Sequence, residues 1–196
     1  MTTLRVQPSP ATTTFLRSVP VFGGLEGPRL AQLYTLLEEQ SWKKGDHLFN
    51  EAELGRTMYV LREGEVDVVR RAASGNPVQI VTLGPGETFG EMTLVELQPR
   101  SASVIARSGA VTYSLTNLDL YRLYEKDSYA YTLILQNICR MLSRRLRKAD
   151  SRIAEFLDAA LEGEKEQVAA LRSASKPHPS RPSKVSKKKS ASKKRK

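Results

Sequence analysis

The sequence contains one cysteine, Cys139, and two histidines, His47 and His178. A single cysteine excludes an internal disulfide framework and a Cys-ligated zinc or iron–sulfur site. Two histidines, one of them in a polar C-terminal segment, are too few for a histidine-rich metal site. We therefore expect no metal and no resident cofactor, and the scarcity of cysteine favours a reducing, cytoplasmic compartment.

Long apolar runs are missing as well. No stretch approaches the roughly 18 apolar residues that a membrane span requires, so no transmembrane segment is expected. Residues 1–11 are polar, contain two prolines and lack the apolar centre of a secretory signal, so they are predicted to be a flexible lead-in. Apolar residues still make up 40% of the chain, which is enough to build the core of one compact domain.

Acidic residues are absent from residues 176–196, which contain ten of the 31 basic residues. The preceding part therefore holds 21 basic and 21 acidic residues, and the formal net charge of +10 belongs to the tail. This distribution argues against a globular nucleic-acid-binding domain with a charged face. Residues 173–196 have almost no apolar content and are predicted to be disordered.

The middle of the chain is rich in short β-type segments. Glycine, asparagine and proline divide residues 41–116, and between these turn signals lie residues 57–61, 66–69, 78–81, 102–106 and 110–113. Helical spacing is found before this region, near residues 14–19 and 28–39. The predicted fold class is therefore α+β, an antiparallel β-roll or jelly-roll barrel flanked by N-terminal helices and a long C-terminal helix.

Helical spacing returns after Asn117, which is the expected N-cap of a helix over residues 118–125. A longer helix is predicted from about Ser128 to Leu171, because this stretch has no proline and one glycine. In this stretch, apolar residues recur at alternating steps of four and three: Leu135, Cys139, Leu142, Leu146, Ala149, Ile153, Phe156 and Ala160. The first half of this seam can pack on its own barrel. Beyond Ala149 no further core remains, so we predict a parallel homodimer through the same helix of a second copy.

Residues 84–104 contain the most specific chemistry. Two glycine turns precede residues 90–95, which can form one helical turn whose free N–H groups bind an anion. Arg100 follows and can pair with a phosphate through two hydrogen bonds. A phosphate would repel Glu91, so this carboxylate requires a donor such as a ribose hydroxyl. These groups together predict a site for a sugar phosphate.

The same residues resemble the phosphate-binding cassette of the cyclic nucleotide-binding domain family. That cassette reads Phe-Gly-Glu, a small and apolar run, then Pro-Arg-small-Ala; the chain has Phe89-Gly90-Glu91-Met92-Thr93-Leu94 and Pro99-Arg100-Ser101-Ala102. The segments Trp42–Asp46 and Tyr59–Val66 also match the family. The resemblance covers about residues 14–153. Family members that bind no nucleotide typically lack the arginine or the glutamate, and both are present here.

The resemblance implies a role for each matched position. Glu91 would accept from the ribose 2′-hydroxyl and Arg100 would pair with the cyclic phosphate, aided by backbone N–H groups near Met92 and Thr93. Four apolar residues would line the base and sugar pocket, although three of them, Val68, Ile80 and Val81, are explained equally well as barrel core. The full set of expected ligand-binding residues is Val68, Ile80, Val81, Phe89, Gly90, Glu91, Met92, Thr93, Arg100, Ser101, Ala102, Arg145, Ala149 and Asp150.

The base that is bound stays open between adenine and guanine. Ala149 offers no donor, whereas Asp150 can accept from the N6 amine of adenine or from the N1 and N2 hydrogens of guanine. Cyclic AMP, the commoner ligand of the family, is the expected ligand, with cyclic GMP as the alternative. No nucleophile–base pair is evident, so a regulatory protein is expected and not an enzyme.

The expected organisation is a lead-in over 1–11, a cyclic nucleotide-binding domain over 12–148, a coiled-coil-like helix extension over 149–172 and a disordered basic tail over 173–196. Activator-type relatives continue into a helix-turn-helix domain, which is not evident here. A second interpretation is a nucleic-acid-associated or scaffold protein with a structural barrel. In that case residues 176–196 bind phosphate backbones without sequence readout, an acidic protein or an anionic membrane surface. A merely solubilising tail explains this composition equally well.

Overall fold

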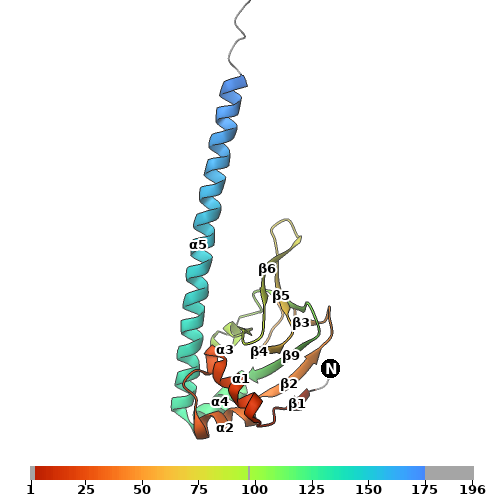
Figure 1. Cartoon of the computed structure of the whole chain (residues 1–196), viewed down its shortest axis with the longest axis vertical. Coiled ribbons are helices and arrows are strands. Elements are labelled where there is room, and N and C mark those ends of the chain that lie inside the picture. Colours follow the sequence, from red (N-terminus) through yellow and green to blue (C-terminus); the bar gives the residue numbers. More distant parts are fainter. Residues whose placement is uncertain (1–2, 97, 175–196) are drawn as a thin grey trace, which may run out of the picture. The chain divides into compact units, whose positions relative to one another are not determined.

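The computed structural model describes residues 3–96 and 98–174. The chain forms two compact units, and the boundary along the chain falls between Arg147 and Lys148. The first unit contains both sheets, the short helices and the beginning of the long helix α5 (Ser128–Ala174). The second unit contains the rest of α5 (Figure 1).

The described strands of the first unit form two antiparallel sheets. One has the order β1-β2-β9-β4-β7 and the other the order β3-β8-β5-β6. The strands are β1 (Thr3–Arg5), β2 (Glu38–Trp42), β3 (His47–Phe49), β4 (Thr57–Glu63), β5 (Val66–Arg71), β6 (Pro77–Leu83), β7 (Thr88–Phe89), β8 (Ser103–Ala106) and β9 (Ala110–Thr116). Buried residues from both sheets, among them Phe49, Leu61 and Val104, form one core between them. This β-roll confirms the predicted fold class.

A second core lies under the helices. These are α1 (Pro10–Ser18), η1 (a 3₁₀ helix, Pro20–Phe22), α2 (Gly27–Leu36), α4 (Asn117–Lys126) and the start of α5, while α3 (Met92–Val95) is one turn. Ala130, Ile134 and Ile138 of α5 are fully buried in this core. Burying one such isoleucine contributes roughly 1.5–3 kcal/mol, so the first turns of α5 are fixed by their own chain. Asn137 adds a hydrogen bond of 2.8 Å to the carbonyl of Gly23.

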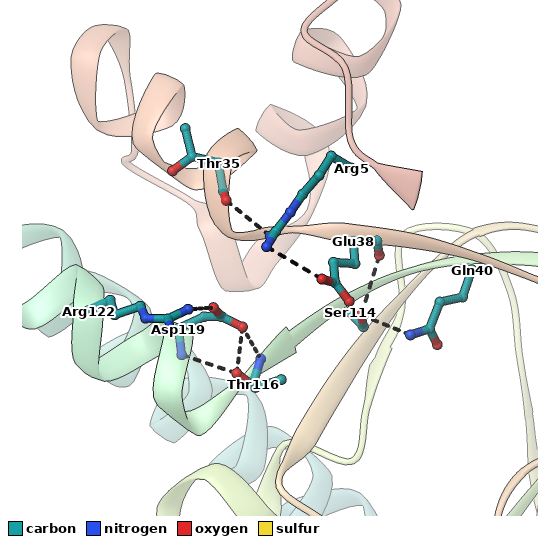
Figure 2. Close-up of polar contacts among 8 residues, drawn as sticks. All are labelled: Arg5, Thr35, Glu38, Gln40, Ser114, Thr116, Asp119 and Arg122. Carbon is teal, nitrogen blue, oxygen red and sulfur yellow. Dashed lines mark hydrogen bonds and ion pairs between the residues drawn. The ribbon is translucent and has the colours of Figure 1, made fainter. Parts of the chain in front are cut away.

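The N-terminal residues differ from their prediction. Within the expected flexible lead-in over 1–11, Thr3–Arg5 form β1, which pairs with β2, and α1 begins at Pro10. Arg5 holds this edge by donating to the Thr35 carbonyl at 3.2 Å and pairing with Glu38 at 3.6 Å (Figure 2). A three-residue strand carries too little alternation to be recognised in a sequence. Its pairing partner lies more than thirty residues away.

The N-cap of α4 is Thr116 and not Asn117. The Thr116 hydroxyl accepts from the Asp119 N–H at 3.1 Å, and the Asp119 carboxylate accepts from the Thr116 N–H at 3.2 Å (Figure 2). This reciprocal pair is a capping box, which requires an acidic or amide residue three positions after the cap. Asn117 has Leu120 at that position, and therefore the cap falls one residue earlier.

The second unit exposes large apolar side chains. Ile153, Phe156, Leu157 and Leu161 are 59%, 73%, 56% and 56% exposed. Ile153 and Phe156 belong to the predicted heptad seam, whereas Leu157 and Leu161 were not part of it. The expected disordered tail falls almost wholly on residues 175–196, which lie outside the described residues. Among the helices of residues 3–96 and 98–174, none has the length and apolar character needed to cross a membrane.

Candidate functional site

Arg100 lies at the centre of the site and is only 5% exposed. Its backbone N–H donates to the Glu53 carbonyl at 2.8 Å, and its carbonyl accepts from the Ala52 N–H at 2.9 Å. Its side chain donates through Nη1 to the Gly90 carbonyl at 3.1 Å and to the Thr93 hydroxyl at 3.0 Å. Two segments, the loop over residues 50–55 and the predicted cassette, therefore converge on one guanidinium.

The Arg100 guanidinium is a buried cation that lacks an ion-pair partner. No carboxylate of residues 3–96 or 98–174 forms an ion pair with it, and its Nε is buried without a hydrogen-bond partner. Burial lowers the pKa of Arg100, and the charges of Tyr59, Glu53 and Glu91 oppose that shift. An unpaired charge is expensive to bury. The arrangement is thus suited to receive an anion.

Gly90 is required by the backbone and by the space around Arg100. Its φ is +72°, a left-handed conformation that side chains rarely adopt. A Cβ on Gly90 would also lie 2.6 Å from Arg100 Nη1 and 3.0 Å from the Thr57 carbonyl. The next turn, α3, is held to Gly90 by the buried Thr93 hydroxyl, which donates to the Gly90 carbonyl at 2.9 Å.

The Glu91 carboxylate is 3% exposed and pairs with Arg145 of α5, with 2.7 Å between Oε1 and Nη1. Arg145 also donates to the Thr88 carbonyl, so one side chain bridges α5 to both β7 and the cassette. The sequence predicted a sugar hydroxyl as the partner of Glu91 and included Arg145 among the expected ligand-binding residues. In the structure these two predicted residues meet each other.

We expect Arg145→Ala to lower the free energy of unfolding by about 1–2 kcal/mol, because it leaves a buried carboxylate unpaired. This loss of unfolding free energy is smaller than that expected for a fully buried ion pair, because the Arg145 side chain is 39% exposed. Urea unfolding followed by Trp42 fluorescence measures the change, and Arg144→Ala, an exposed neighbour, is the control. In a double-mutant cycle, Glu91→Gln should make Arg145→Ala less harmful. A coupling free energy near zero contradicts a stabilising pair.

The remaining predicted residues divide between core and surface. Val68 and Val81 face each other across β5 and β6, are half-buried and pack against the core between the sheets, whereas Ile80 is 45% exposed. Phe89 is buried and stacks on Tyr59 with 5.4 Å between ring centroids. Packing thus accounts for Phe89 as fully as a ligand contact does.

Five further predicted residues lie around the cassette or outside it. Met92 is exposed, and the Ser101 hydroxyl is 3.8 Å from its sulfur, while Ala102 is half-buried. Ala149 and Asp150 belong to the second unit and are exposed. The structure therefore brings together Phe89, Gly90, Glu91, Thr93, Arg100 and Arg145 from the predicted set.

The loop over residues 50–55 was missed by sequence reasoning. A Cβ on Gly55 would lie 2.3 Å from Arg100 Nε, so only glycine leaves room for the guanidinium. The Phe49 ring also contacts the guanidinium, with 4.0 Å between the ring centroid and Arg100 Cζ. The only local signal was Gly55 itself, just before the β-type segment over residues 57–61, and it did not indicate its partner 45 positions away.

A separate groove of about 500 Å³ lies along β3, β5 and β8, lined in part by Glu51, Arg70 and Arg71. The Glu51 carboxylate in this groove accepts from the backbone N–H of Arg71 at 2.8 Å and pairs with the Arg70 guanidinium at 3.8 Å. Neither Glu91 nor Arg100 lines it. In the part of the chain that the structure describes, no cluster of His, Cys, Asp or Glu could hold a metal ion.

Comparisons with known proteins identify a related family. Residues 39–127 match the family model described as the cyclic nucleotide-binding domain. The chain is 30% identical over 139 residues to the cyclic AMP receptor protein of Thermus thermophilus. This alignment covers 69% of this chain and 61% of that protein. It is 36% identical over 98 residues to human cGMP-dependent protein kinase 2, covering 50% of this chain and 13% of the kinase.

Solved structures show the same fold. The crystal structure of the N-terminal domain of a transcriptional regulator from Streptomyces coelicolor A3(2) is 29% identical with a TM-score of 0.60, covering 71% of this chain and 94% of that one. The catabolite activator protein of Thermus thermophilus has a TM-score of 0.62 over 68% of this chain and 61% of its own. The chain spans about three fifths of the length of the first curated relatives, 61% and 59%.

Proposed function

Because the chain contains a domain of the cyclic nucleotide-binding family, we propose that it is a regulatory protein that binds a cyclic nucleotide at Arg100 and Glu91. The observation that carries this proposal is the buried Arg100 guanidinium, which has no ion-pair partner among the described residues and has a buried Nε without a hydrogen-bond partner. A cyclic phosphate supplies the missing negative charge. The role is regulatory because the matched family is a binding domain and not a catalytic one.

Glu91 is proposed to accept a hydrogen bond from the ribose 2′-hydroxyl. Because Glu91 also holds Arg145, a sugar at this carboxylate changes the contact between the cassette and α5. Ligand binding thereby acts on the helix that carries the apolar seam. A ligand shifts such an equilibrium only by its difference in affinity for the two arrangements.

Cyclic AMP is the proposed ligand and cyclic GMP the alternative. The names of the relatives support both, since one is a cyclic AMP receptor protein and another a cGMP-dependent kinase. Ser101 in the cassette is compatible with either. The other expected contacts from the first unit, Val68 and Val81 among them, remain part of the proposed pocket.

We also propose a homodimer through the second half of α5. The support is the run of exposed apolar side chains from Ile153 to Leu161, a patch that a monomeric helix does not need. The proposed interaction of residues 176–196 with nucleic acid or an acidic partner depends on residues outside those that the structure describes.

Calorimetric titration of the full chain tests the proposed ligand. Cyclic AMP is expected to bind saturably with a stoichiometry of one per chain, and adenosine to bind more weakly by about 100-fold because it lacks the phosphate. Cyclic GMP is titrated in parallel to rank the two bases. Absence of heat and of thermal stabilisation with both cyclic nucleotides would refute the proposed function.

A further inference from the structure

The Arg100 guanidinium occupies a slot formed by Phe49, Gly55 and Gly90. Its Cζ lies 4.0 Å from the centroid of the Phe49 ring. A Cβ on Gly55 would come within 2.3 Å of Nε and 2.6 Å of Cζ, and a Cβ on Gly90 within 2.6 Å of Nη1. Phe49 is the last residue of β3 and Gly55 lies in the connection to β4, and neither is part of the cassette motif.

The Phe49 ring is a rigid surface for the cation. It is 7% exposed, and its centroid lies 6.0 Å from that of Tyr59 and 6.1 Å from that of Phe89. Two neighbouring rings thus fix its orientation. A cation over an aromatic face is attracted to the ring, and this attraction is stronger where water is excluded.

The same loop also holds the backbone of Arg100. Glu53 and Ala52 bond to its N–H and carbonyl on either side, at 2.8 and 2.9 Å. Gly55 is not in a left-handed conformation, so the reason for glycine there is space for the guanidinium and not backbone strain. The loop over residues 50–55 therefore controls both ends of the Arg100 side chain.

We infer that Phe49 and Gly55 are positioning residues, which act through Arg100 to set the orientation of its guanidinium toward the phosphate. This inference rests on the proposed function. It adds a specific consequence, because a defect in the slot should weaken recognition of the phosphate and leave recognition of the nucleoside unchanged. The readout is therefore the ratio of the affinity for cyclic AMP to the affinity for adenosine.

Phe49→Leu is expected to lower this ratio by about tenfold, because leucine keeps the apolar volume and removes the aromatic face. Gly55→Ala is expected to lower it by at least as much, because the added Cβ displaces the guanidinium. Phe49→Tyr restores the ring and should keep the ratio within twofold. The matched controls are Phe22→Leu, in the core under the helices, and Gly109→Ala, where a Cβ meets nothing within 4 Å. Both should leave the ratio unchanged even where they lower stability.

A second readout needs no ligand. In an NMR spectrum of the full chain, the ring current of Phe49 should shift the Arg100 Nε–H signal. The signal is assigned with Arg100→Lys, in which it should be missing. The shift should be lost in Phe49→Leu and retained in Phe49→Tyr. If the signal is shifted but the chain binds no cyclic nucleotide, the proposed function is contradicted and the contact between Phe49 and Arg100 is not. An unchanged affinity ratio or an unchanged Nε–H signal in Phe49→Leu would overturn the positioning role.

Discussion

Arg100→Ala is expected to lower the affinity for cyclic AMP by about 100-fold or more. Removing one partner of a buried, hydrogen-bonded charge pair costs about 2–5 kcal/mol, and each 1.4 kcal/mol corresponds to roughly a factor of ten in the dissociation constant. Lysine is not expected to restore binding, because the slot beside Phe49 and Gly55 fits a planar guanidinium. Calorimetry with the folded variants measures the loss.

A substitution of Arg100 is expected to lower the affinity for the ligand but to raise the stability of the protein without ligand. Arg100 is a buried cation with no ion-pair partner among the described residues, so Arg100→Met removes a desolvated charge while keeping much of the apolar volume. We expect the free energy of unfolding without ligand to rise by about 1 kcal/mol. Such a gain is typical of a binding residue whose partner is absent, since function there opposes stability.

The control for both measurements is Arg107→Ala. Arg107 follows β8 and is paired at the surface with Glu65 and Asp67, at 3.7 and 3.5 Å, so its loss should alter affinity by less than twofold. If Arg100→Met instead destabilises the chain and Arg100→Ala leaves affinity intact, Arg100 is a structural residue. That result would remove the observation on which the proposed function depends.

The proximity of Gly90 and Arg100 was predictable because the two residues are close in sequence. Gly90, Glu91 and Arg100 lie within eleven positions, so their residue types and spacing indicated an anion site before any tertiary contact was known. The structure adds the reason for the glycine, its φ of +72°. The capping box at Thr116 was also local, and attention to Asp119 three residues later would have identified it.

The missed features depend on contacts between distant residues. Gly55 and Arg100 are 45 positions apart, and Glu91 and Arg145 are 54 apart, so no spacing rule connects them. Strands β1 and β7 have three and two residues, which is too short for an alternating pattern. Residue type also could not assign Phe89, because phenylalanine occurs both in cores and in ligand pockets. Only the structure shows that Phe89 is buried in the core.

Phe156→Glu combined with Ile153→Glu is expected to convert the full chain from a dimer to a monomer. The two side chains are 73% and 59% exposed within one chain, and fully burying each would contribute roughly 1.5–3 kcal/mol. Glutamate removes this contribution and places like charges opposite each other across a parallel seam. Light scattering after size exclusion measures the mass against the 21.9 kDa of one chain.

The matched control is Ala154→Glu, which adds the same charge at an exposed position outside the seam and should leave the dimer intact. The single cysteine tests the register, because in a parallel, in-register seam Cys139 lies opposite Cys139 of the second copy and is exposed for reaction. A short bismaleimide should therefore yield a covalent dimer from the wild type and little from the Phe156→Glu, Ile153→Glu variant. A wild-type mass of one chain at micromolar concentration would contradict the dimer. A dimer that Cys139 fails to cross-link would instead exclude the parallel, in-register arrangement, because the exposed apolar side chains from Ile153 to Leu161 would then pair in another geometry.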